Sequence, residues 1–68
     1  MEHYYVNDEA QTTGEHEVHK DNCTFLPSVS NRTYLGLFNF CSDAVAKAKE
    51  KHLNVDGCKF CCPACHTR

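Results

Sequence analysis

Two short stretches decide the fold: HKDNC at residues 19–23 and CKFC at residues 58–61. Each stretch begins and ends with a side chain that binds metal ions. A tetrahedral zinc ion takes four ligands at about 2.0–2.3 Å, and structural sites usually receive them as two close pairs from separate segments. The spacing therefore predicts one zinc site, formed by His19, Cys23, Cys58 and Cys61.

The length of the chain explains why a metal is needed. With 68 residues it forms one domain, residues 1–68. A chain of this length buries only about 60% of the surface that its unfolded form exposes. Domains of this size usually add disulfides, a metal or a partner to their core. Six cysteines and five histidines are present and tryptophan is absent, so we expect zinc as a structural cofactor.

Patterns outside the metal motifs predict three strands. Residues 3–6 have strand composition, and residues 15–19 alternate, with Glu15, Glu17 and His19 on one face. Residues 33–38 form the third strand, in which Gly36 indicates a bulge or a close backbone approach. We expect most of the core to be aromatic: Tyr4, Tyr5, Phe25, Tyr34, Phe38 and Phe40.

One helix is predicted after the third strand. Ser42 is a suitable N-cap, because its hydroxyl accepts a hydrogen bond from the first turn. Small apolar residues recur at helical spacing from Ala44 to Ala48, and we expect the helix to end near Leu53. Asp56-Gly57 then makes a turn before Cys58. The predicted fold is α+β, with a three-stranded antiparallel sheet and one helix stapled by zinc.

A second group of candidate ligands overlaps the first, because CPACH follows directly at residues 62–66. Three interpretations stay open. In the first, a second zinc site is formed by Cys41, Cys62, Cys65 and His66. In the second, Cys62 and Cys65 replace Cys58 and Cys61 in a single site. In the third, some of these thiols are free or paired in disulfides. For Cys41 alone we favour packing against the helix.

The motifs together resemble a known kind of zinc domain. Their order is His19-x3-Cys23, Leu26-Pro27, Tyr34-Leu35-Gly36, Ser42-Asp43-Ala44-Val45 and Gly57-Cys58-x2-Cys61. This order is similar to the metal-binding module of the Ada DNA-repair protein and to modules appended to some bacterial nucleases. The resemblance covers roughly residues 16 to 62 and implies the same four zinc ligands. In the Ada module a cysteine that accepts the methyl group stands where this chain has His19, so methyl transfer is not expected.

Charge and hydropathy narrow the choice of partners. A net charge of −2 gives no long-range attraction to a phosphate backbone. No apolar run approaches the ~20 residues that span a membrane, and residues 1–8 do not read as a signal peptide. We therefore expect a cytoplasmic location, where cysteines stay reduced and serve as metal ligands more often than as disulfides.

Three functions fit these features. The first is a structural zinc-binding interaction module with an unknown protein partner. It would not be an enzyme, because four protein ligands leave the metal no open position. The second is a nucleic-acid-binding zinc module, suggested by the family resemblance. The third is a thiol-based redox or metal-sensing protein that uses Cys58, Cys61, Cys62 and Cys65.

Overall fold

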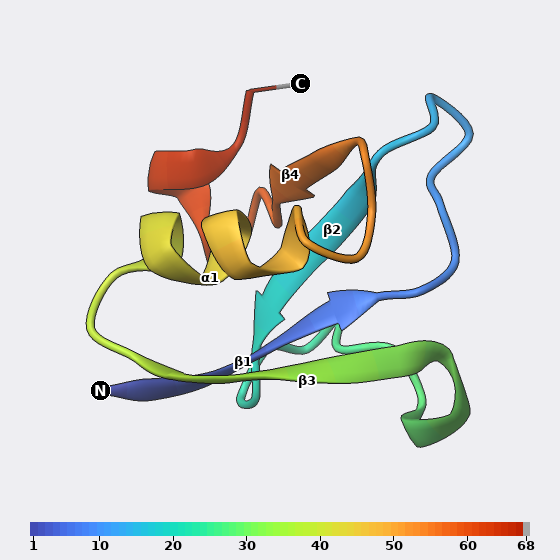
Figure 1. Ribbon diagram of the computed structural model, residues 1–68. Helices are drawn as coiled ribbons and strands as arrows, with labels where there is room; N and C mark the ends of the chain where they lie inside the picture. Colours follow the sequence, from blue (N-terminus) through green and yellow to red (C-terminus); the bar gives the residue numbers. More distant parts are fainter. Residues whose placement is uncertain (68) are drawn as a thin grey trace.

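In the computed structural model, which describes residues 1–67, four strands form one sheet and an α-helix packs on one of its faces (Figure 1). The spatial order of the strands is β3-β1-β2-β4. Their bounds are Glu2–Asn7 for β1, His16–Lys20 for β2, Arg32–Phe38 for β3 and Val55–Gly57 for β4. Strand β1 pairs antiparallel with both β2 and β3, whereas β4 pairs parallel with β2.

The sheet corrects the predicted topology. The α+β class and the three predicted strands are confirmed, but β4 adds a fourth strand and makes the sheet mixed. Only three residues long, β4 gives no alternating pattern that a sequence can reveal, and its Asp56-Gly57 was expected to be a turn. The helix carries the chain from β3 at one edge to β4 at the other, which is how a parallel partner for β2 is reached.

The helix α1 spans Cys41–Ala48 and is shorter than expected. It begins one residue after its N-cap, Phe40, so Ser42 lies in the first turn and does not cap it. Its buried residues are Ala44 and Ala48, and the helix ends where this apolar stripe ends. Within residues 1–67, no helix has the length and apolar character needed to cross a membrane.

The core lies between the helix and the sheet, and it is less aromatic than predicted. Within residues 1–67, Tyr4 is the one aromatic side chain among its buried members; the others are Val6, Val18, Leu35, Ala44, Ala48 and Cys62. By contrast, Phe25, Tyr34 and Phe40 are exposed. A seven-member cluster of mostly small side chains is a modest core. A disulfide or a bound metal ion can therefore determine whether the domain folds.

Two glycines meet specific requirements of the backbone. Gly36 has a φ of 132°, and the pairing of β1 with β3 shifts register between Tyr4 and Tyr5, which confirms the predicted irregularity. At Gly57 a Cβ atom would lie 2.7 Å from the Cβ of Cys65 and 2.8 Å from the carbonyl oxygen of Cys62. Residues 62–65, which form the C-terminal turn, therefore pack directly on β4.

Candidate metal centre

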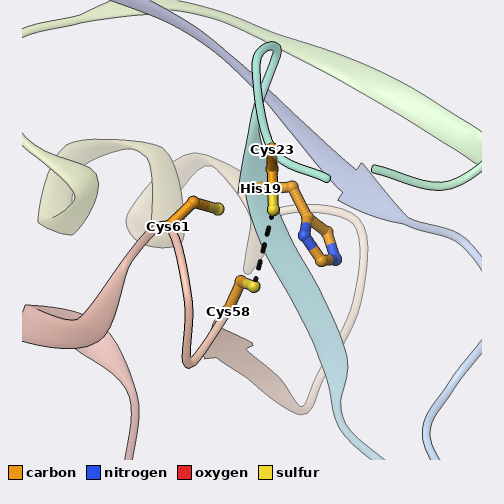
Figure 2. A group of neighbouring side chains, drawn as sticks. All are labelled: His19, Cys23, Cys58 and Cys61. Atoms are coloured by element: carbon orange, nitrogen blue, oxygen red, sulfur yellow. Dashed lines mark hydrogen bonds between the residues drawn. The ribbon is translucent and has the colours of Figure 1, made fainter. Parts of the chain in front are cut away.

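The pairing of β2 with β4 brings the two predicted ligand pairs together. Val18 on β2 is the register partner of Gly57 on β4, so His19 is the next residue of β2 and Cys58 is the first residue after β4. The backbone amide of Cys58 donates to the carbonyl of Val18 at 2.9 Å. Cys23 and Cys61 then lie in the turns that follow β2 and β4 (Figure 2). The strand that the sequence did not reveal is thus the element that builds the site.

The four side chains predicted as ligands form a compact group. One ligand atom from each of His19, Cys23, Cys58 and Cys61 lies within 4.8 Å of all the others. The Sγ atoms of Cys23 and Cys58 are 3.8 Å apart. A tetrahedral ion with metal–sulfur bonds of about 2.3 Å separates its sulfurs by about 3.8 Å. The group can hold a metal ion without rearrangement of this pair.

Backbone amides prepare two of the thiols for a metal. The amide of Lys20 donates to Cys61 Sγ at 3.3 Å, and the amide of Phe25 donates to Cys23 Sγ at 3.4 Å. Burial raises the pKa of both Cys61 and Cys62, which disfavours thiolates in the metal-free protein. A bound cation reverses this preference, because it stabilises the negative charge that burial penalises.

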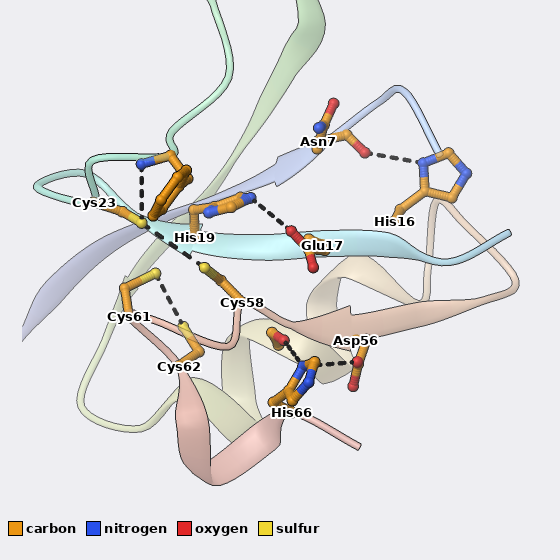
Figure 3. Close-up of polar contacts among 12 residues, drawn as sticks. Asn7, His16, Glu17, His19, Cys23, Asp56, Cys58, Cys61, Cys62 and His66 are labelled. Atoms are coloured by element: carbon orange, nitrogen blue, oxygen red, sulfur yellow. Dashed lines mark hydrogen bonds and ion pairs between the residues drawn. The ribbon is translucent and has the colours of Figure 1, made fainter. Parts of the chain in front are cut away.

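His19 is in the state that a metal ligand requires. Burial lowers its pKa, so the imidazole is neutral. Its Nε2 faces Glu17 Oε1 at 3.5 Å, whereas its Nδ1 is buried and has no hydrogen-bond partner within residues 1–67 (Figure 3). A carboxylate beside one ring nitrogen keeps the proton there and leaves the lone pair on the other. A metal at Nδ1 would remove the cost of about 1–3 kcal/mol of this unpartnered atom.

The second group of candidate ligands is arranged differently. Cys41 and Cys65 form a disulfide that joins the start of α1 to the C-terminal turn. Cys41 was expected only to pack against the helix, so that prediction is incomplete. Cys62 is buried in the core, with its Sγ 3.8 Å from that of Cys61. His66 turns its Nδ1 to the carbonyl of Gly57 at 3.0 Å and to Asp56 Oδ2 at 3.2 Å (Figure 3).

These contacts correct two of the three interpretations of that group. A disulfide leaves Cys41 and Cys65 no thiolate for a second zinc ion, and it leaves Cys65 none for the first. In the part of the chain that the structure describes, no second group of three or more His, Cys, Asp or Glu side chains lies as close together. Disulfide pairing, the third interpretation, is the one that the structure contains.

Sequence reasoning did not assign a role to Glu17 or to Phe60. The signal for Glu17 was present, because alternation along a strand places residues 17 and 19 on the same face. Phe60 lies between the two cysteines of its motif, and its ring contacts that of Phe25 at a tilt of 30°, with centroids 4.6 Å apart. Nothing in the sequence links these two rings, because they meet only when the two ligand loops meet.

Comparison of the chain with protein-family models, curated proteins and solved structures gives no match. The resemblance to the Ada module therefore rests on the residue pattern alone. What the protein does must be argued from the geometry of this site.

Proposed function

We propose that this domain is a zinc-stapled interaction module. One observation carries the proposal: four ligand atoms, from His19, Cys23, Cys58 and Cys61, lie within 4.8 Å of one another. Three thiols and an imidazole are soft ligands, which suit zinc and do not suit magnesium or calcium. The resemblance to Ada-type zinc modules, noted from the sequence, supports the same choice of metal.

The zinc in this proposal is structural and performs no catalysis. Four protein ligands complete a tetrahedron, so no position is left for water or substrate. Structural zinc contributes about 10–16 kcal/mol of apparent binding free energy in small domains near neutral pH. A core of this size supplies about 3–5 kcal/mol. The metal would thus decide whether the chain is folded, and the folded surface would serve to bind a partner protein.

Native mass spectrometry of the reduced, zinc-supplied protein tests this proposal. We expect one zinc ion per chain, lost on addition of a chelator together with the narrow charge-state distribution of a folded protein. The Cys58→Ser variant should bind no zinc, because a hydroxyl is a poor ligand for this ion. A folded wild-type chain that carries no metal would contradict the proposal.

Two alternatives have different support. Binding of nucleic acid is suggested by the family resemblance, but a net charge of −2 counts against it. A thiol-based redox function is favoured by one observation, the Cys41–Cys65 disulfide in the same C-terminal turn as Cys62. Disulfides are rare in cytosolic proteins unless they take part in redox reactions. Alkylation of free thiols in protein taken directly from cells would test both the redox alternative and the proposed cytoplasmic location.

A further inference from the structure

A hollow of about 340 Å³ opens beside the candidate metal centre. Two of the ligands, His19 and Cys58, line it, together with Glu17, Lys59 and the rings of Phe25 and Phe60. This volume is at the lower end of the range of about 300–1,000 Å³ that is typical of sites for small ligands and side chains. The hollow is therefore large enough to receive one side chain of a partner.

Two exposed aromatic rings form one wall of this hollow. Phe25 is 56% exposed and Phe60 is 66% exposed, although their ring centroids lie only 4.6 Å apart. Each ring belongs to one ligand loop: the amide of Phe25 donates to Cys23 Sγ, and Phe60 lies between Cys58 and Cys61. A metal that joins the two loops also holds the two rings together, at a place where they add nothing to the core.

The charges around the hollow favour a cation. Three thiolates and a neutral imidazole around a divalent ion leave the centre with one net negative charge. Glu17 adds a carboxylate whose side chain is 20% exposed. Within residues 1–67 its one polar contact is with His19 Nε2, so most of its four or so acceptor positions stay free. The ammonium group of Lys59 is exposed and opposes only part of this charge.

We propose that this hollow binds a lysine or arginine side chain of a partner protein. The carboxylate of Glu17 would pair with the cation, and the rings of Phe25 and Phe60 would contact its alkyl stem and its charged head. Aromatic faces attract such cations within about 6 Å, most strongly where water is excluded. The inference rests on the proposed function, because the metal supplies part of the charge and joins the two ring-bearing loops.

The test is an NMR titration of the zinc-loaded full chain with short blocked peptides. The probes are Gly-Arg-Gly and Gly-Lys-Gly, with Gly-Gln-Gly, Gly-Glu-Gly and oligothymidylate as comparisons. We expect amide shift changes confined to residues near 7–11, 17–19, 25 and 58–60, and only with the basic peptides. Phe60→Ala should weaken this binding at least fivefold. Phe40→Ala is the matched control: Phe40 is 67% exposed, does not line the hollow and should leave binding unchanged.

Glu17→Gln provides the second variant, and its zinc content is measured in the same samples because Glu17 also contacts His19. A variant that keeps zinc should bind the basic peptides at least fivefold more weakly. If zinc is lost, Phe60→Ala carries the test by itself. A wild-type chain that holds zinc but ignores both basic peptides, or binds the neutral or acidic peptide equally well, overturns this inference alone. Preferential binding of oligothymidylate overturns it in favour of nucleic acid, and a chain that holds no zinc overturns the proposed function as well.

Discussion

Two sets of sulfur atoms connect distant parts of this small domain, and they do so by different chemistry. The candidate metal centre joins the ends of β2 and β4 through His19, Cys23, Cys58 and Cys61. The Cys41–Cys65 disulfide joins the start of α1 to the C-terminal turn and closes a separation of 24 residues. The first connection depends on metal and protons, whereas the second depends only on redox conditions. The two can therefore be broken one at a time.

The largest effect is expected from removing one metal ligand. Cys23→Ser, Cys58→Ser and Cys61→Ser should each abolish stoichiometric zinc binding and unfold the domain, because the lost binding free energy exceeds what the core supplies. Circular dichroism and zinc content of the purified variants check this. Cys62→Ala is the matched control, since Cys62 is a free cysteine that directly follows Cys61 and is as buried as Cys58, but lies outside the ligand group. Zinc lost from Cys62→Ala but kept in Cys61→Ser would show that the ligand register is wrong.

A smaller effect is expected from removing the disulfide. The double variant Cys41→Ala/Cys65→Ala should stay folded with its zinc, but its free energy of unfolding should fall by about 2–4 kcal/mol, which is typical of a native disulfide. Urea denaturation in excess zinc measures the difference from the wild type. A double variant that cannot hold zinc would mean that the two connections are not independent.

Glu17 offers a finer test of the metal centre. Replacing a carboxylate that orients a histidine ligand usually lowers metal affinity about 10–100-fold. Because glutamine keeps an oxygen in the same place, we expect the lower end, about tenfold, for Glu17→Gln. Competition with a chromophoric zinc chelator gives the affinity. Glu50→Gln is the control: Glu50 is an exposed residue just after α1, and its replacement should leave the zinc affinity unchanged. If Glu17→Gln and Glu50→Gln bind zinc equally tightly, Glu17 does not orient His19 for the metal.

The smallest effect concerns the contacts of Asp8, which involve no residue of either sulfur set. Burial alone would raise the pKa of Asp8, but hydrogen bonds from Thr33, His52 and Lys51 outweigh it and lower the pKa to about 2. A carboxylate whose pKa is lowered by folding stabilises the folded state at pH values above its pKa in the unfolded chain, about 3.9. This stabilisation is lost as the pH falls toward 2. Since Asp8 is partly exposed, Asp8→Asn should cost only about 1 kcal/mol.

The pH dependence of that cost is a separate check. Zinc release at low pH affects the wild type and Asp8→Asn alike, so it cancels in the difference between their stabilities. The difference should shrink as the pH falls from 5 toward 3, because the unfolded wild-type chain then takes up a proton at Asp8 and the folded chain does not. A difference that stays constant between pH 5 and pH 3 would show that the pKa of Asp8 is not lowered.

The two sulfur sets also differ in how far the sequence predicts them. The ligands of the metal centre are close pairs, and a spacing of two or three residues restricts where their side chains can point. The disulfide joins single cysteines, Cys41 and Cys65, whose proximity depends on how α1 packs on the C-terminal turn. No local pattern encodes that packing.

The same distinction holds for the rest of the fold. The three longer strands carry their own residue patterns, whereas β4 exists because β2 offers it an edge. The exposure of Phe25 was not predicted either, because the hydrophobicity of a side chain does not reveal whether the core has room for it. Local spacing thus predicted which four side chains come together, and tertiary contacts decided the remainder.

The most direct test compares a chelator with a reductant on the same zinc-loaded sample. The amide NMR spectrum is recorded after addition of EDTA, and separately after addition of a phosphine reductant that spares zinc. If the metal centre holds the fold, EDTA collapses the dispersion of amide shifts and releases one zinc ion per chain, while the reductant alone leaves most of the dispersion intact. A spectrum that survives EDTA and collapses only with the reductant would contradict the account, because the disulfide would then be the staple.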